Sequence, residues 1–295
     1  MMKKMEDIIV WDEVDASRIT PEETEQAYRE VLRRSCVAEG LVREQQRLDR
    51  CRYLRMSLSV AACLVVLFVF LFYRVGKETS SPLCQYAAVA GETKEVTLPD
   101  QSRVKLNGGS LLIFADSFKD TREVFLSGEA VFDVTADEEH PFFVRTADVT
   151  IRVVGTRFDV KAYPDDAISQ TTLERGKVQV WPNRDPDRVV TLNPSEQFLF
   201  ERQSGAVTTQ SIRLNEAFAW EHGEMCFRSA SIFDIIKVLE RQSGCKVHLT
   251  TQRYNSSVIT ARFVHGETPD EVMEALCAVI PGMRYQREGN YIYIQ

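Results

Sequence analysis

Apolar residues are distributed differently along three stretches of the chain. The first 55 residues carry many charges between scattered apolar positions, residues 56–73 carry none, and turn residues divide the remainder into short apolar runs. Apolar positions spaced three and four apart are typical of helices, whereas short runs bounded by Gly, Pro, Asn and Asp are typical of strands. The pattern predicts a multi-domain chain with short helices before the uncharged stretch and mostly strands after it.

Residues 56–73 read MSLSVAACLVVLFVFLFY, which is 18 residues without a charge. A helix of that length extends about 27 Å, close to the thickness of a bilayer's hydrocarbon layer. A buried core helix is rarely apolar on every face, and a signal peptide has a much shorter charged segment before it. Val60–Cys63 resembles a lipoprotein cleavage box, but the apolar run Leu64–Phe72 follows the cysteine instead of preceding it. We therefore expect one transmembrane helix over residues 56–73.

The charges that flank this stretch predict its orientation. Only Arg74 and Lys77 lie just after it, whereas five arginines lie just before it: Arg43, Arg47, Arg50, Arg52 and Arg55. Positively charged flanks stay in the cytoplasm. Residues 1–55 are therefore expected in the cytoplasm and residues 74–295 on the other side of the membrane.

The cytoplasmic segment, residues 1–55, has the pattern of two short helices. Thr20-Pro21-Glu22-Glu23 is typical of a helix start, with Thr20 as the N-cap. The apolar face of that helix consists of Tyr28, Val31, Leu32 and Cys36. Because residues 41–73 contain no Gly or Pro, a second helix is expected to continue into the membrane. Two short helices bury little apolar surface by themselves. They form either a solvated stalk or a surface that docks on another protein.

Residues 74–85 are a polar linker, and residues 86–212 have the pattern of an all-β domain. Breaks such as Asn107-Gly108-Gly109, Ser127-Gly128 and Pro164-Asp165-Asp166 separate its apolar runs, and no capped helical period of ten residues appears. The runs include 123–126, 130–134, 142–145, 149–154, 157–162, 177–181 and 197–200. This spacing predicts a solenoid- or sandwich-like domain, or a barrel.

Residues 213–295 have the pattern of a small α+β domain. One helix is expected to begin after Ser231 and to end at Gly244, and another to begin after Thr268 and to end at Pro281-Gly282. A strand-like run lies before and after each helix, and a hairpin precedes the final strand, Tyr291–Ile294. The order predicts two βαβ units.

Composition narrows the possible functions. The 295 residues include 44% hydrophobic and 27% charged residues, which excludes a mainly disordered chain. The net charge of −7 argues against a basic surface that binds nucleic acid directly. Of the seven cysteines, those at positions 84, 226, 245 and 277 lie beyond the membrane stretch. A disulfide could form there. None of the four shows the spacing of metal ligands, and we expect buried free thiols.

Motifs for catalysis or metal binding are missing from the sequence. It has no nucleophile elbow, phosphate-binding loop or zinc-protease motif. His222-Gly223-Glu224 and His265-Gly266-Glu267 lack the cysteine pair of a zinc deaminase, so we interpret both as turns. The acidic run Asp137-Glu138-Glu139 is interpreted as a solvated loop. We expect a protein that is not an enzyme, with no catalytic residue, metal, cofactor or small-molecule substrate.

Several runs resemble the FecR-like family of single-pass anti-sigma regulators, over about residues 90–200. They are VTLPD (96–100), VKLN (104–107), FKDTREV (118–124), LSGEAVFDV (126–134), PFFV (141–144), VGTRFDVKAY (154–163) and LERGKV (173–178). Trp220, Gly223, Phe227 and the run Ile235–Arg241 resemble the domain that often follows, which is similar to signalling domains of secretins and TonB-dependent receptors. The family commonly has Gly-Thr at Gln101-Ser102 and Asn at Asp159, which we interpret as changes at turn or surface positions.

The resemblance implies a protein of the inner membrane that relays a signal. In that family, the inner segment sequesters a sigma factor of the extracytoplasmic-function class, and the periplasmic part contacts the signalling domain of a TonB-dependent outer-membrane receptor. Tyr28, Val31, Leu32 and Cys36 are the candidate sigma-factor contacts. Tyr291, Ile292, Tyr293 and Ile294 are the candidate receptor contacts, because a last strand at a sheet edge can accept a partner strand; alternatively, it completes its own sheet.

A function of another class also fits these residues. A membrane-anchored periplasmic module that binds glycan or cell wall would need no cytoplasmic signalling. An anchored hydrolase has no motif in its favour.

Overall fold

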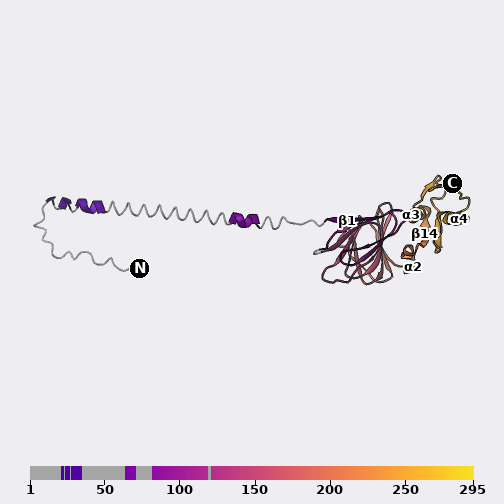
Figure 1. Ribbon diagram of the computed structural model, residues 1–295, viewed down its shortest axis with the longest axis horizontal. Coiled ribbons are helices and arrows are strands. Elements are labelled where there is room, and N and C mark those ends of the chain that lie inside the picture. Colours follow the sequence, from indigo (N-terminus) through magenta and orange to yellow (C-terminus); the bar gives the residue numbers. More distant parts are fainter. Residues whose placement is uncertain (1–20, 23, 27, 35–63, 71–81, 119–120) are drawn as a thin grey trace. The chain divides into compact units, whose positions relative to one another are not determined.

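The computed structural model describes residues 21–22, 24–26, 28–34, 64–70, 82–118 and 121–295. The chain divides into two compact units, Met1–Thr79 and Ser80–Gln295. Strands predominate in the second unit, and its helices are few and short (Figure 1). The prediction that the part of the chain after the uncharged stretch is rich in strands, with a few helices, is therefore confirmed.

In the first unit, residues 21–22, 24–26 and 28–34 are helical, as are residues 64–70. Arg29 pairs with Glu25 at 3.3 Å and Arg34 pairs with Glu30 at 3.2 Å, one helical turn apart in each case. Such pairs on an exposed helix each stabilise it by about 0.2–0.5 kcal/mol.

Parts of two predicted elements lie outside the described residues. These parts are the N-cap Thr20 and Cys36 of the inner helix, and residues 56–63 and 71–73 of the predicted span. Within the part of the chain that the structure describes, no helix is both long and apolar enough to cross a membrane.

The β-rich domain, Leu83–Ser211, consists of two sheets that share one long strand, β5. The first sheet has the order β1–β4–β5–β6–β7–β10–β11, and the second has the order β2–β3–β5–β8–β9–β12–β13. The bounds are β1 Leu83–Ala88, β2 Lys94–Thr97, β3 Arg103–Leu106, β4 Ser110–Ala115, β5 Arg122–Asp133, β6 Phe142–Arg145, β7 Val149–Val153, β8 Arg157–Ala162, β9 Ile168–Arg175, β10 Val178–Pro182, β11 Val190–Leu192, β12 Glu196–Glu201 and β13 Val207–Ser211.

Strand β5 passes from one sheet to the other. Its first part, Arg122–Phe125, pairs in parallel with β6, and its second part, Gly128–Asp133, pairs antiparallel with β8. Gly128 has a φ of 123°, and a Cβ at this position would overlap Ser110 of β4. The expected break at Ser127-Gly128 is therefore wrong, because this glycine lets the strand bend between two sheets without ending.

The apolar core lies between the two sheets. Phe132 of the second sheet stacks on Phe158 at 5.3 Å and meets Phe142 of the first sheet at 6.3 Å between ring centroids. All three side chains are fully buried. Because side chains alternate along a strand, residues next to them, such as Val131 and Asp159, lie on the outer face of the second sheet.

The C-terminal domain, Met225–Ile294, follows a connecting segment that contains α2 and η2. The bounds are α2 Leu214–Ala217, η2 Ala219–His222, β14 Met225–Ser231, α3 Ile232–Ser243, β15 Lys246–Leu249, β16 Val258–Phe263, α4 Pro269–Val279, β17 Tyr285–Glu288 and β18 Tyr291–Ile294. Ser231 caps α3 and Gly244 ends it with a φ of 72°. Thr268 and Glu271 form a reciprocal capping box at the start of α4. Both predicted helix starts are confirmed.

The strands of this domain pair across the two strand–helix–strand halves. β14 pairs antiparallel with β16, and β18 lies between β15 and β17, parallel to the first and antiparallel to the second. Each helix therefore connects strands of different sheets, unlike a βαβ unit with both strands in one sheet. Of the two positions considered for Tyr291–Ile294, the structure shows the one that completes the domain's own sheet. Hydrogen bonds to two neighbours leave this strand no free backbone edge, so the edge alternative is wrong.

Candidate functional site at the domain junction

The connecting segment lies against the outer face of the second sheet. Trp220 is 6% exposed, and its Nε1 donates a hydrogen bond to Oδ1 of Asp159 at 3.3 Å. Phe218, Trp220 and Val131 form a small apolar cluster apart from the two main cores. Val131 and Asp159 of the β-rich domain are thus buried by the connecting segment.

Two cations of the second sheet also hold this segment. Lys105 Nζ donates to the main-chain oxygen of Glu221 at 2.8 Å, and Arg157 Nη2 lies 2.8 and 3.0 Å from the two carboxylate oxygens of Glu221. Hydrogen bonds between ionised groups are stronger than neutral ones. The segment is therefore fastened to the sheet by polar bonds to Glu221, the residue that follows Trp220.

Two carboxyl groups are buried on this face of the second sheet. Asp159 is 4% exposed and Glu129 is 8% exposed, and Asn107 Nδ2 donates to Glu129 at 2.6 Å. Burial, and then the negative charge of Glu129, raises the pKa of Asp159 well above its usual value, although the bond from Trp220 opposes this rise. The surface or turn position expected for Asp159 is wrong, because the connecting segment covers it.

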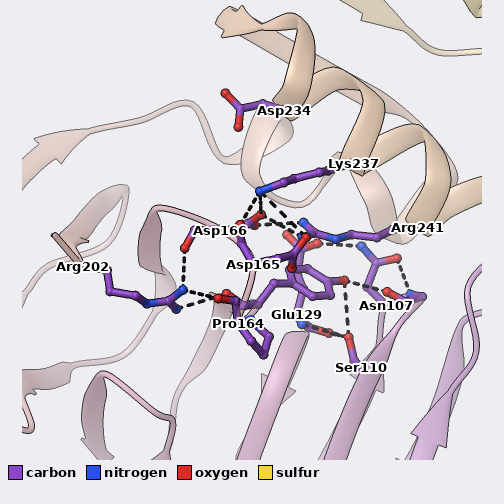
Figure 2. A network of polar contacts seen from close by, with 12 residues as sticks. Asn107, Ser110, Glu129, Pro164, Asp165, Asp166, Arg202, Asp234, Lys237 and Arg241 are labelled. Atoms are coloured by element: carbon purple, nitrogen blue, oxygen red, sulfur yellow. Dashed lines mark hydrogen bonds and ion pairs between the residues drawn. The ribbon is translucent and has the colours of Figure 1, made fainter. Parts of the chain in front are cut away.

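Arg241, near the end of α3, is the central residue of the contact between the two domains (Figure 2). Its Nη1 and Nη2 bind the two carboxylate oxygens of Asp166 at 2.9 and 2.8 Å, and Nη2 also lies 2.8 Å from Asp165. Its guanidinium lies 3.6 Å from the centre of the Tyr163 ring. Lys237, one turn earlier, lies 3.3 Å from Asp166 and also binds the main-chain oxygen of Asp165.

The acidic turn that receives Arg241 is itself held in place from the β-rich domain. Arg202 donates to the main-chain oxygens of Pro164 and Asp166 (Figure 2). It also donates to the main-chain oxygen of Tyr163 and to the carboxylate of Asp148. The backbone of the turn that carries Asp166 is therefore held by the β-rich domain, independently of α3. Such preorganisation lowers the entropic cost of forming the contact.

Arg241 and Asp166 each stabilise the ionised form of the other. Burial by itself would raise the pKa of Asp166, but hydrogen bonds from Arg241 and its positive charge outweigh burial and lower that pKa. Burial likewise works against the charge on Arg241, and Asp166 outweighs it, so the pKa of Arg241 is raised. Both groups are ionised at neutral pH.

The main chains of the two domains also touch. Gly91 N donates to the main-chain oxygen of Arg241 at 2.8 Å. A Cβ at Gly108 would overlap that same oxygen, and a Cβ at Gly244 would lie 2.9 Å from the main-chain oxygen of Ala90. Only glycine permits so close an approach, so the β-rich domain is shaped to receive the end of α3.

A groove of about 320 Å³ opens at the same junction. Its lining includes Glu92 and Asn107 from the β-rich domain, Glu221 from the connecting segment, and Gln242 and Glu267 from the C-terminal domain. The junction thus combines a buried polar network with an open polar groove.

The candidate sigma-factor contacts lie in the first unit. Tyr28 and Val31 are each 64% exposed and Leu32 is 46% exposed, whereas Cys36 lies outside the described residues. The apolar face predicted for this helix is therefore accessible at its described positions.

The candidate receptor contacts divide into two pairs. Ile292 and Ile294 are fully buried in the core of the C-terminal domain. Tyr291 is 49% exposed, and both Tyr291 and Tyr293 stack against His248 of β15, at 6.0 and 5.5 Å between ring centroids. Only the tyrosine side chains are placed to meet a partner.

The remaining motifs have structural roles. Gly223 and Gly266 both have a positive φ, and Glu267 accepts from the main-chain nitrogens of Val264 and His265. Asp137 likewise accepts from the main-chain nitrogens of Glu139 and His140. Both interpretations, as turns and as a loop, agree with these contacts.

A metal or disulfide site among the described residues would require suitably placed cysteine, histidine or acidic side chains. All four described cysteines are free thiols, as expected, but only Cys245 is buried; Cys84, Cys226 and Cys277 are partly exposed. Among the residues that the structure describes, no group of three or more His, Cys, Asp or Glu side chains could hold a metal ion.

Sequence reasoning did not find the junction. Arg241 and Asp166 are separated by 75 positions, and each occurs in a local pattern with its own explanation, a helix for one and a turn for the other. The one available signal was the pair of adjacent acids in a turn, together with two cations one helical turn apart.

The fold and the junction define a class of two-domain proteins in which a two-sheet β domain carries a small α+β domain in fixed contact. Residues 85–179 match the FecR protein family, and residues 224–294 match the C-terminal domain of FecR. This chain belongs to the FecR family.

Two crystal structures are similar to the chain, each of a candidate anti-sigma factor from Parabacteroides distasonis, at 2.50 and 1.65 Å resolution. Their sequences are 31% and 30% identical to this one, and the TM-score is 0.67 for both. Each match covers 72% of this chain and 98% of the other. No curated protein matches the chain.

Proposed function

We propose that this protein is an anti-sigma factor of the inner membrane that relays a signal from outside the cell. Residues 1–55 hold an extracytoplasmic-function sigma factor in the cytoplasm, residues 56–73 cross the membrane once, and residues 74–295 lie in the periplasm. There they receive the signal from the signalling domain of a TonB-dependent outer-membrane receptor.

The similarity to the two candidate anti-sigma factors carries this proposal. It extends over nearly the whole length of those chains at about one-third identity, and it spans both the β-rich and the C-terminal domains. A family match to either domain alone would leave the role of the pair open. The uncharged stretch of 18 residues supports the membrane anchor.

The inner helix supports the sigma-factor contact. Its apolar side chains at positions 28, 31 and 32 are exposed, although apolar groups gain free energy when another surface covers them. A sigma factor that supplies an apolar groove would bury them. Binding that hides the surface by which the sigma factor reads promoters keeps its target genes silent.

The stacked Tyr291, His248 and Tyr293 side chains are the proposed receptor contact. Tyrosine is common at binding hot spots because its ring is large and rigid and its hydroxyl can bond. Since β18 is a central strand, a receptor that contacts it binds through these side chains and not by pairing with its backbone.

Deletion of residues 1–55, with the membrane stretch kept, tests the proposal. Transcription from the promoters of the sigma factor should then become independent of the inducing nutrient, while the shortened protein still reaches the membrane. The purified segment should also capture an extracytoplasmic-function sigma factor. Unchanged transcription, together with retained binding of cell-wall glycan by the outer part, would favour the glycan-binding alternative.

A further inference from the structure

We propose that Arg241 is a latch that locks the C-terminal domain onto the β-rich domain, so that the two domains move as one rigid body. The proposal goes beyond the function given above because it concerns how a signal crosses the outer part, whatever partner supplies that signal. It rests on the contacts of one side chain and of the main chain beside it (Figure 2).

Arg241 uses both its side chain and its main chain across the junction. The guanidinium binds the turn that contains Asp165 and Asp166 and stacks on Tyr163, and the main-chain oxygen accepts from Gly91. These partners belong to two separate loops of the β-rich domain, between β1 and β2 and between β8 and β9. One residue thus fastens the end of α3 at two places.

The latch is a second attachment between the domains, separate from the connecting segment that joins them covalently. The connecting segment is already fixed to the sheet through Trp220 and Glu221. A domain held at one place can pivot there, whereas a domain held at two separated places cannot. Arg241 supplies the second place, 21 positions after Trp220 in the sequence.

The two acids of the turn contribute unequally. The side chains of Arg241 and Asp166 are 11% and 13% exposed, and their bond is bidentate. The side chain of Asp165 is 60% exposed. Solvent screens exposed ion pairs so that they contribute little, whereas removing one partner of a buried pair leaves an unpaired charge. Asp166 is therefore the receiving half of the latch, and Asp165 is dispensable.

The consequence for signalling rests on the proposed function. A receptor that binds the C-terminal domain does not tilt it against the β-rich domain; it displaces or holds the entire outer part. A signal that depends on separating the domains must first break the bond between Arg241 and Asp166.

Hydrogen exchange of the full-length protein in detergent tests the latch without any sigma factor or receptor. The amide of Gly91 reports the junction directly, because its acceptor is the main-chain oxygen of Arg241. Arg241→Ala should raise the exchange rate of the peptide containing Gly91 by about tenfold or more. Peptides from the core strands β5 and β8 should stay protected.

Matched variants separate the latch from general damage. Arg284→Ala removes an exposed arginine of the same domain and should leave exchange at Gly91 unchanged. Asp166→Asn keeps the shape of the side chain but removes its charge, and should open the junction, whereas Asp165→Asn should have little effect.

Two results would overturn the latch. The first is exchange at Gly91 in Arg241→Ala that equals exchange in Arg284→Ala. The second applies if Arg241→Ala also raises exchange in the core strands, because that variant then reports general unfolding. In that case Asp166→Asn is the test, and unchanged exchange at Gly91 in Asp166→Asn contradicts the proposal. Because no transcription is measured, failure of the latch is distinct from failure of the anti-sigma role.

Discussion

Asp159 is a buried acid whose charge costs the folded protein free energy. Burial raises its pKa, so the folded state binds a proton more tightly than the unfolded state does. The free energy of unfolding therefore falls as pH rises from the ordinary carboxyl pKa to the raised one, and it levels off above that. Ionisation of Asp159, which Trp220 covers, therefore destabilises the folded state.

We predict that Asp159→Asn stabilises the unit Ser80–Gln295 at neutral pH by about 1–3 kcal/mol and has little effect near pH 4. Asparagine keeps an oxygen for Trp220 Nε1 but carries no charge. Urea unfolding followed by tryptophan fluorescence over a pH series measures the difference. Asp185→Asn, in an exposed loop, is the control. A difference that does not grow with pH would contradict the assignment.

For Asp166, the free energy of unfolding should depend on pH in the opposite direction. Its pKa is lowered in the folded state because Arg241 outweighs burial, so it contributes stability above the ordinary carboxyl pKa and loses it as pH falls through the lowered one. Asp166→Asn should cost about 1.5–3 kcal/mol at neutral pH, typical of a hydrogen bond between charged groups. The same urea series measures it, and the variant and the wild type should converge at low pH. Parallel curves would show that the charge of Asp166 is not what matters.

The helix that contains residues 28–34 has an exposed apolar face, which is the proposed contact with the sigma factor. Val31→Asp combined with Leu32→Asp places charge in the proposed apolar contact, which costs several kcal/mol if the contact is buried. Target genes should then be transcribed without the inducing nutrient, as a reporter assay at matched protein levels would measure. Glu25→Ala with Arg29→Ala alters the charged side chains instead and should keep repression. Normal repression by the double aspartate variant would exclude this face.

Strand β18 lies between β15 and β17, so its tyrosine side chains are its proposed contact with the receptor. Tyr291→Ala with Tyr293→Ala should weaken binding of the receptor's signalling domain by about tenfold or more, as loss of aromatic hot spots does. Isothermal titration of the full-length protein in detergent measures the affinity. Val189→Ala, at an exposed apolar position of the β-rich domain, should bind normally. Equal affinity of both variants would place the receptor contact elsewhere.

At the scale of the whole molecule, the proposed relay requires residues 1–55 and residues 74–295 to lie on opposite sides of the membrane. A reporter that is active only in the periplasm should work when fused after Gln295 and fail when fused before Met1, because five arginines precede the uncharged stretch. Enzyme activity in intact cells measures both fusions. The reverse pattern would show that the chain is inserted the other way.

The sequence by itself determined the local features of this protein. Ser231 and Gly244 define the ends of α3, and Thr268 with Glu271 defines the start of α4, because capping involves residues within one helical turn. The β-rich character followed from short apolar runs between turns, and the family resemblance from motifs within those runs. Each of these features depends on near neighbours in the chain.

Only the tertiary structure decided which elements meet. The bend of β5 at Gly128, the central place of β18 and the burial of Asp159 all depend on partners tens of positions away. The bond between Arg241 and Asp166 spans 75 positions. No periodicity reports such a contact, because alternation along a strand or helix shows which side is buried but not what covers it.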